Sequence, residues 1–254
     1  MASSNSAGRA DPSPFDLPGA GRAAALCLHG LTGTPYEVRP LGEAFARRGI
    51  RAFGPALPGH NETPEQLARV SYTAWVEAAR AHLGELRASS ERIFVVGVSM
   101  GGLVALELAA DEPVDALVTI GTPLWLHHPL ARLIPLAKHL SPMQRKRRGS
   151  DIRDEIARER HPSYDVMPLP AVHELQKLQA RVRGRLSRVT APILIAHGAH
   201  DRTARPADAR KIHAGVGSSI RELMFFESSA HVVPVDVDGP RLAEAAAEFL
   251  MQHA

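Results

Sequence analysis

The sequence predicts an α/β protein with a mostly parallel central sheet that carries helices on both faces. Short apolar runs alternate along the chain with stretches in which apolar residues recur at helical spacing. The central runs are apolar nearly throughout, as expected for strands that are covered on both sides. Between residues 122 and 188 this alternation stops, which indicates an insertion into the sheet domain.

The expected strands and helices follow one another in a regular order. The strands are residues 24–28, 51–53, 92–96, 116–120, 193–196 and 221–225. The helices are residues 37–48, 72–87, 103–110 and 241–251. In the second of these helices Trp75, Ala79 and Leu83 share one face, which we expect to pack on the sheet.

The insertion, residues 122–188, is expected to form a small helical lid over one edge of the sheet. The apolar residues of its first part recur at helical spacing, and Pro135 is expected to break or kink this run. They are Leu126, Leu130, Leu133, Ala137 and Leu140. Two interpretations stay open and do not exclude each other. The stripe packs onto the core, or it forms the apolar, substrate-binding wall of an acyl pocket.

Composition and charge exclude several classes of protein. The 254 residues are 44% hydrophobic and 22% charged, with a net charge of only +3, so nucleic acid is not an expected partner. The basic run over residues 144–148 is interpreted as a solvated loop or helix end. Cys27 is the only cysteine, which excludes an intrachain disulfide, and it is expected to be a buried thiol of a strand.

The N-terminal residues 1–21 are rich in Ser, Gly and Pro, and they lack the basic start and apolar block of a secretory signal. We expect them to be a flexible lead-in to one domain that spans residues 22–254. No stretch approaches the ~18–20 apolar residues of a membrane span. The sequence therefore predicts a cytoplasmic protein without stable membrane anchoring, either a monomer or a homodimer.

Ser99 lies in the sequence Gly-Val-Ser-Met-Gly, which fits the pattern Gly-x-Ser-x-Gly. In this pattern a tight turn from strand to helix lifts the serine hydroxyl above a sheet, and small residues on either side let the backbone pass close by. Here the pattern stands between the clear strand 92–96 and the helix 103–110. This context predicts that Ser99 is a nucleophile.

A serine hydroxyl needs a base to take its proton and an acid to orient that base. In such folds the order along the chain is Ser, Asp or Glu, then His. Among 13 histidines, His231 follows the last expected strand and precedes the last helix, on the same rim as Ser99. Asp201 is the carboxylate in the loop after the strand 193–196. We therefore expect a catalytic triad of Ser99, Asp201 and His231.

Two backbone N–H groups are expected to stabilise the oxyanion of the reaction. One belongs to Met100, directly after the nucleophile. The other is expected at Leu31, in the loop His29-Gly30-Leu31-Thr32-Gly33 that follows the first strand. His29 is interpreted as a structural hydrogen-bonding residue. The sequence indicates no metal cluster and no dinucleotide motif, so no cofactor is expected.

With these residues in place, the chain resembles the bacterial carboxylesterase and monoacylglycerol lipase family of α/β hydrolases. The resemblance runs from Leu26 to the C-terminus and rests on several short segments. They are residues 28–33, 58–60, 97–101 and 121–124, Asp201 and residues 229–232. It implies the α/β-hydrolase fold with a small lid, and hydrolysis of short- to medium-chain esters, monoacylglycerols among them, through an acyl-enzyme.

The resemblance extends into the lid at residues 149–151 and 155–162, which look more like monoacylglycerol lipases than simple carboxylesterases. It implies that Glu155 helps to hold the glycerol moiety of the substrate; an exposed helix glutamate is the alternative. Thioesterases, peptidases and carbon–carbon bond hydrolases of this fold have the same triad. A non-catalytic ligand receptor is the alternative of a different class, and it would require a broken triad or oxyanion loop.

Overall fold

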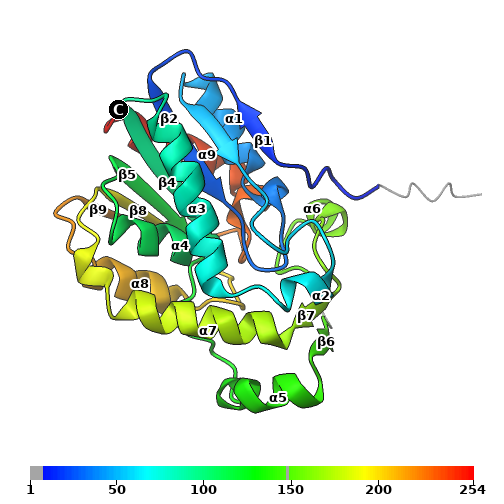
Figure 1. Ribbon diagram of the computed structural model, residues 1–254. Helices are drawn as coiled ribbons and strands as arrows, with labels where there is room; N and C mark the ends of the chain where they lie inside the picture. The colour runs from blue at the N-terminus through cyan, green and yellow to red at the C-terminus, as the bar shows by residue number, and fades with distance from the viewer. Residues whose placement is uncertain (1–7, 147–148) are drawn as a thin grey trace, which may run out of the picture.

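The central sheet in the computed structural model has seven strands in the order β1-β3-β2-β4-β5-β8-β9, and all neighbours are parallel except the edge pair β1 and β3 (Figure 1). The structure describes residues 8–146 and 149–254. The strands are β1 (Phe15–Leu17), β2 (Ala23–Leu28), β3 (Arg51–Gly54), β4 (Arg92–Val98), β5 (Ala116–Ile120), β8 (Ile193–Gly198) and β9 (Arg221–Phe226). The predicted α/β-hydrolase fold is confirmed.

Helices cover both faces of this sheet. On one face lie α1 (Arg39–Arg47) and α9 (Gly239–Met251); on the other lie α3 (Tyr72–Arg87), α4 (Met100–Ala109), α7 (Leu169–Arg183) and α8 (Pro206–Gly215). Successive side chains of a strand point to opposite faces, so each strand supplies two cores. In β2, for example, Leu26 packs among α3 and α4, whereas Cys27 packs among α1 and α9.

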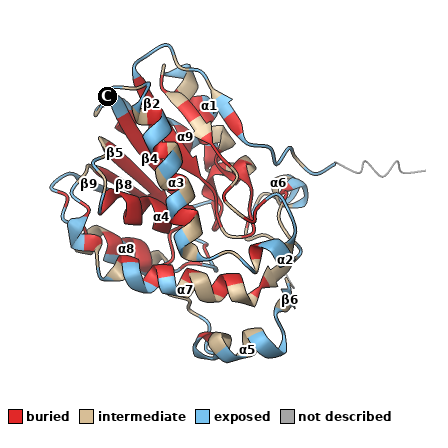
Figure 2. Ribbon diagram, in the orientation of Figure 1, coloured by how far each residue is buried: buried red, intermediate tan, exposed pale blue. Residues whose placement is uncertain are grey.

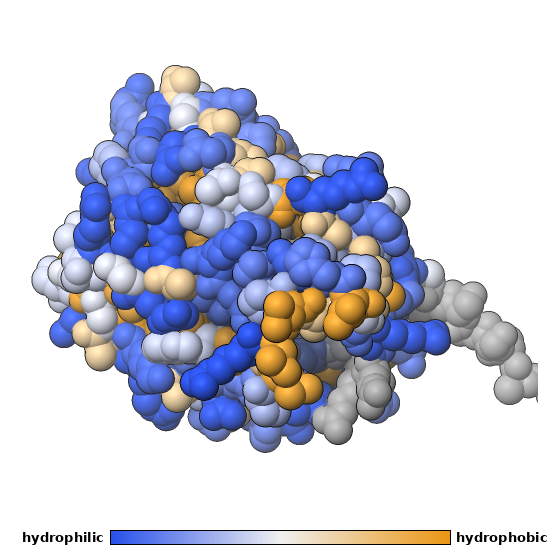
Figure 3. Space-filling model, turned by 60° about the horizontal axis from the view of Figure 1, so that its bottom comes forward, coloured by the Kyte–Doolittle hydropathy of each residue, from blue (hydrophilic) through white to orange (hydrophobic). Residues whose placement is uncertain are grey.

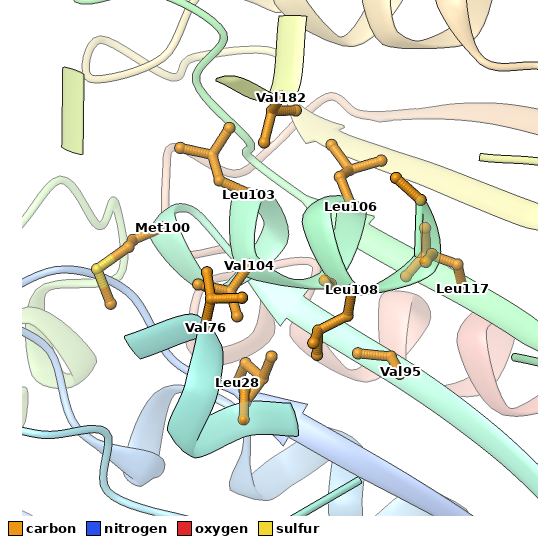
Figure 4. Packing of buried hydrophobic residues seen from close by; sticks show 14 of the residues in the cluster. Leu28, Val76, Val95, Met100, Leu103, Val104, Leu106, Leu108, Leu117 and Val182 are labelled. Atoms are coloured by element: carbon orange, nitrogen blue, oxygen red, sulfur yellow. The ribbon is translucent and has the colours of Figure 1, made fainter. Parts of the chain in front are cut away.

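The helix after the predicted nucleophile is the most deeply buried of the molecule. All ten residues of α4 are buried, which Figure 2 shows as a red helix between the sheet and the outer helices. Leu103 and Leu106 face Val182 of α7, while Val104 lies beside Val76 of α3 (Figure 4). A helix that is apolar all round is stable only when it is enclosed in this way. The start of α4 is therefore held in a fixed place.

The chain between β5 and β8 is an insertion with strands as well as helices. It contains α5 (Ile134–Leu140), β6 (Met143–Arg145), α6 (Glu155–Arg160), β7 (Val166–Pro168) and α7. The strands β6 and β7 pair antiparallel, with Gln144 opposite Met167, and the sequence did not predict them. The basic run was interpreted as a loop or helix end; its residues 144 and 145 belong to β6, while 147 and 148 lie outside the described residues.

The leucine stripe of the insertion does not pack onto the core. Leu130, Leu133 and Leu140 are 58%, 51% and 89% exposed, and they form with the 69% exposed Leu136 an apolar surface on and beside α5 (Figure 3). The first interpretation of the stripe is therefore wrong for these residues; Leu126 is half-buried against the core. Pro135 stands in the first turn of α5, where it starts the helix rather than kinking it.

The N-terminal region needs one correction. Residues 15–17, expected to be part of a flexible lead-in, form the edge strand β1, and the first seven residues lie outside the described part. Phe15 is 5% exposed and packs against Gly42 and Gly54, a tertiary contact that a three-residue strand does not reveal in sequence. No helix in the described ranges is long and apolar enough to cross a membrane.

Candidate active site

The predicted catalytic residues lie on loops at one rim of the sheet. Because parallel strands end on the same side, the loops after β2, β4, β8 and β9 come together there. They carry Leu31, Ser99, Asp201 and His231 in that order. The fold thus gathers residues that are up to 200 positions apart in the sequence.

Ser99 occupies a strained turn between β4 and α4. Its φ of 54° and ψ of −115° lie in a region that non-glycine residues rarely adopt. The turn is tight because a Cβ at Gly97 would overlap the backbone of Gly101, and one at Gly101 would overlap that of Leu28. The Ser99 N–H donates to the carbonyl of Ile120 at 2.8 Å. Such strain persists only where the surroundings impose it, and it places the hydroxyl of the half-buried Ser99 above the sheet.

Ser99, His231 and Asp201 form one hydrogen-bonded chain. The Ser99 Oγ lies 2.9 Å from His231 Nε2, and His231 Nδ1 lies 2.8 Å from Asp201 Oδ2. Asp201 and His231 are each 7% exposed. The carboxylate accepts from Nδ1–H, which leaves Nε2 free to accept the proton of the serine. This geometry is the one that nucleophilic catalysis by serine requires.

Asp201 is fixed by four donors. Its Oδ1 accepts from the N–H groups of Thr203 and Ala204 at 2.8 and 2.7 Å. Its Oδ2 faces both His231 and the buried His197, whose Nε2 lies 3.1 Å away. That Nε2 also lies 3.2 Å from the Ala204 carbonyl, a second acceptor, so it must carry a proton. Burial alone would raise the pKa of Asp201. The two histidines lower it by more than burial raises it, so the pKa lies below its ordinary value and the group is a carboxylate.

The charge of Asp201 also acts on His231. Burial alone would lower the pKa of this imidazole, because the charged form is disfavoured away from water. The attraction of Asp201 and its hydrogen bond outweigh that effect, so the pKa of His231 is raised above its ordinary value of 6.5. An imidazole with a raised pKa is a stronger base for the serine proton.

The loop after β2 is shaped so that the Leu31 N–H can point to the oxyanion. The buried His29 accepts from the Leu57 N–H through Nε2 at 3.1 Å, so its proton is on Nδ1. Nδ1–H donates to the Gly30 carbonyl at 3.0 Å, and the Gly33 N–H donates to the same oxygen at 3.2 Å. In a trans peptide the C=O and the next N–H point in opposite directions. Fixing the Gly30 carbonyl therefore fixes the Leu31 N–H.

The second predicted donor, the Met100 N–H, stands at the start of α4. The N-terminal N–H groups of a helix lack intrahelical partners and favour negative charge. Within the described ranges, neither the Met100 N–H nor the Leu31 N–H has an acceptor in the protein. Both groups are thus available to a substrate oxygen.

The predicted substrate-binding residues of the insertion lie mostly at the surface. Glu155 is the first residue of α6, its side chain is 83% exposed, and it lies 3.5 Å from Arg158. Leu130 and Leu133 are exposed beside α5, and Leu126 is half-buried. A polar cavity of about 230 Å³ lies among residues of the insertion and Arg9, and the glutamate that lines it is Glu159.

A larger open cavity of about 570 Å³ is lined by residues 199–202, Asp201 among them, and by Ala230 next to His231. The other charged side chains of its lining are Arg153, Arg158 and Arg202, a basic set that does not suit a metal ion. Across residues 8–146 and 149–254, no group of three His, Cys, Asp or Glu side chains is placed to hold one.

Three acidic residues that support the site were missed from the sequence. Asp151 of the insertion binds both catalytic loops: its carbonyl accepts from the His231 N–H at 3.0 Å, and its carboxylate accepts from the Arg202 N–H at 2.8 Å. Asp236 accepts from the Ala230 N–H at 2.7 Å. Glu37 lies under the oxyanion loop. Asp236 and, to a lesser degree, Glu37 stand in apolar stretches, whereas Asp151 stands among charged residues, and neither setting says what the carboxylate binds.

Comparisons with known proteins agree with this geometry. The family model described as Serine aminopeptidase, S33, matches residues 19–238. The chain is similar to "Thermostable monoacylglycerol lipase" of Bacillus sp. (strain H-257), with 31% identity over 238 residues and 92% of each chain covered. It is 27% identical to "Carboxylesterase" of Bacillus subtilis (strain 168) over 240 residues, which cover 94% of this chain and 96% of that one.

Solved structures show the same likeness. One, from work on the metagenome-derived lipolytic enzymes LipS and LipT, has a TM-score of 0.91 at 29% identity and covers 97% of this chain and 100% of its own. The monoacylglycerol lipase of Paleococcus ferrophilus has a TM-score of 0.84 at 19% identity, with 96% and 100% covered. At that identity the second likeness concerns the fold alone.

Proposed function

Because the chain belongs to the hydrolase family described as Serine aminopeptidase, S33, we propose that it cleaves carboxylic esters through an acyl-enzyme on Ser99. It is a serine hydrolase of the type that includes carboxylesterases and monoacylglycerol lipases. The observation that carries the proposal is the hydrogen-bonded chain from Ser99 through His231 to Asp201.

In the first half of the proposed reaction, Ser99 Oγ attacks the ester carbonyl carbon while His231 Nε2 takes its proton. The carbonyl oxygen becomes an oxyanion that accepts from the N–H groups of Leu31 and Met100. Asp201 stabilises the imidazolium that forms. The tetrahedral intermediate then expels the alcohol, to which His231 returns the proton, and the acyl group stays on Ser99.

In the second half, water takes the place of the alcohol. His231 removes a proton from the water, the hydroxide attacks the acyl carbonyl, and the same two N–H groups hold the oxyanion. The bond from Ser99 Oγ to the acyl carbon breaks, and His231 protonates the serine. The carboxylic acid leaves and the enzyme is restored. His231 carries every proton that moves, first from Ser99 to the alcohol and then from the water to Ser99.

A burst experiment tests this chemistry. Mixing the protein with p-nitrophenyl butyrate should release one equivalent of p-nitrophenol rapidly if the acyl-enzyme accumulates, and a fluorophosphonate probe should label the protein at Ser99. Ser99→Ala should abolish turnover and labelling. The control is Ser228→Ala, an exposed serine of the loop that also carries His231. Failure of the wild-type protein both to turn over esters and to accept the probe would overturn the proposal.

For the substrate, we propose short- to medium-chain esters and monoacylglycerols in particular. The relative named as a monoacylglycerol lipase supports this choice, because it is similar over 92% of the chain. We keep the proposal that Glu155 recognises the glycerol hydroxyls, since a carboxylate accepts such hydrogen bonds well. Glu155 is exposed, whereas the neighbouring Glu159 lines the polar cavity, so the two residues can be compared directly.

The comparison uses monoacylglycerols and p-nitrophenyl esters of matched acyl length. Glu155→Ala should lower kcat/KM on monoacylglycerols and leave the p-nitrophenyl series unchanged, with Glu159→Ala as the matched variant on the same helix. Equal effects on both series, or an effect of Glu159→Ala alone, would refute recognition by Glu155. Acyl thioesters and aminoacyl anilides in the same panel separate an esterase from a thioesterase and from the aminopeptidase in the family's description.

A further inference from the structure

The oxyanion loop contains a strained residue that needs outside support. Thr32 has a φ of 63°, in the left-handed region that favours glycine, and its side chain is buried. A non-glycine residue keeps this conformation only where several contacts impose it. Its neighbour Leu31 is the proposed oxyanion donor, so whatever holds Thr32 also sets the direction of that N–H.

Glu37 supports the loop from below. Its side chain is 5% exposed, and Oε2 accepts from the Gly30 N–H at 2.7 Å. A Cβ at Gly33 would overlap the Glu37 carboxylate, so the loop closes directly over this group. Burial alone would raise the pKa of Glu37, but His161 and the Gly30 N–H lower it to about 2, and Glu37 is therefore ionised. A charged acceptor makes the stronger hydrogen bond to the loop.

The partner of Glu37 comes from the insertion, 124 residues later. His161 Nε2 lies 3.1 Å from Glu37 Oε1, its side chain is 3% exposed, and its Nδ1 lies 2.6 Å from Ser150 Oγ. Both nitrogens thus have partners within one enclosed network. Because Glu37 holds the loop and His161 holds Glu37, the insertion is attached to the oxyanion loop through a buried pair.

Two further contacts join the same two parts of the chain. Lys146 Nζ donates to Thr32 Oγ1 at 2.7 Å and to Ser163 Oγ at 3.2 Å. The Tyr164 N–H donates to the Thr32 carbonyl at 3.2 Å. The strained residue is therefore held through both its side chain and its backbone, and both donors belong to the insertion.

We propose that Glu37 and His161 are positioning residues for catalysis, which fix the Leu31 N–H in the direction that the oxyanion requires. The proposal rests on the proposed ester hydrolysis and extends it to groups that do not touch the substrate. It makes the insertion a working part of the oxyanion hole rather than only a cover. Loss of the pair leaves substrate binding intact and weakens the interaction that forms only in the transition state.

The test compares two substitutions of Glu37 with a matched control. Glu37→Ala removes the acceptor of the Gly30 N–H and should lower kcat on p-nitrophenyl butyrate by about 10²-fold, as loss of one oxyanion donor does, with KM within about 3-fold. Glu37→Gln retains an oxygen for Gly30 and should recover most of the activity. The control is Glu107→Ala, a glutamate of α4 that is equally buried and paired with Arg181 and Arg185.

A second readout distinguishes positioning from stability. Phosphonylation by a fluorophosphonate replaces fluoride by Ser99 Oγ, and the phosphoryl oxygen gains negative charge in its transition state as the ester oxygen does. Its rate constant should therefore fall in parallel with kcat in Glu37→Ala and in His161→Ala, but not in Glu107→Ala. The double variant of Glu37 and His161 should be no slower than Glu37→Ala alone, because the two act as one unit. All variants are compared at temperatures below their measured Tm.

The outcomes separate this proposal from the one on which it rests. If wild-type protein hydrolyses esters but folded Glu37→Ala and His161→Ala have kcat within about 3-fold of it, the pair is only structural and the inference is overturned. If Glu37→Ala does not fold, His161→Ala and Glu37→Gln decide the question by the same two rate constants. A wild-type protein without esterase activity or labelling would instead refute the proposed function.

Discussion

Asp201→Asn gives the sharpest test of the candidate triad, because the surroundings dictate which way the new amide turns. Two backbone N–H groups, those of Thr203 and Ala204, point at Oδ1, against the single N–H of His197 at Oδ2, so the amide oxygen is favoured at Oδ1. The amide NH₂ then takes the place of Oδ2 and faces His231 Nδ1 as a donor. The imidazole must accept at Nδ1 and carry its proton on Nε2, where it can no longer accept the proton of Ser99.

The expected loss follows from this forced tautomer. In a serine protease the equivalent substitution lowers kcat by ~10⁴ with the geometry intact, or about 5 kcal/mol of transition-state stabilisation, and we expect a similar loss here. The assay is kcat on p-nitrophenyl butyrate after titration of active sites. The matched control is Asp208→Asn, a fully buried carboxylate that binds His127 and the Leu124 N–H and should retain activity. A folded Asp201→Asn variant with kcat within tenfold of wild type would refute the role of Asp201.

Three further outcomes follow from the structure. His231 must be neutral to act as a base, and its pKa is raised, so kcat/KM should fall as the pH is lowered, with a midpoint above pH 6.5. A midpoint below pH 6.5 would contradict the effect of Asp201 on this imidazole. Ser99→Gly should be more stable than Ser99→Ala by about 1 kcal/mol, or ~2–4 °C in Tm by calorimetry, because glycine alone tolerates the φ of 54° without strain. Equal Tm values of the two variants would show that the turn is unstrained. Leu136→Ser should change the free energy of unfolding in urea by less than about 0.5 kcal/mol, because Leu136 is exposed, whereas Leu178→Ala in the buried face of α7 should cost ~2–5 kcal/mol. A large loss of stability in Leu136→Ser would mean that α5 is covered in solution.

The sequence was most informative where local pattern and burial coincide. Apart from Arg92 and Thr119, the run 92–96 and the strand β5 are apolar because both faces of a central parallel strand are covered, so their position could be read directly. Ser99 could be found because its turn needs small residues at fixed positions beside it. Asp201 and His231 followed from the order of the strands, since the carboxyl ends of parallel strands share one rim.

What could not be predicted depends on contacts between distant segments. Helical spacing shows that Leu133 and Leu140 share a face with their neighbours, but not whether anything covers that face, and in the structure nothing described does. Glu37 and His161 each look like ordinary polar residues, and only the fold brings them to 3.1 Å. The edge strand β1 is three residues long, too short for any periodicity to be seen.

The insertion therefore divides into two parts with different physical character. From Lys146 to Tyr164, its described residues are attached to the catalytic loops by buried or charge-assisted hydrogen bonds, at Thr32, Glu37 and the loops of Asp201 and His231. Moving this part as a unit would leave buried polar groups without partners, which is costly. The helix α5 contains no buried residue and presents leucines to the solvent, and it packs mainly against α7, so its displacement would leave the contacts at Thr32 and Glu37 in place. If substrate entry requires the insertion to move, that movement belongs to α5, while the part that shapes the oxyanion loop stays in place.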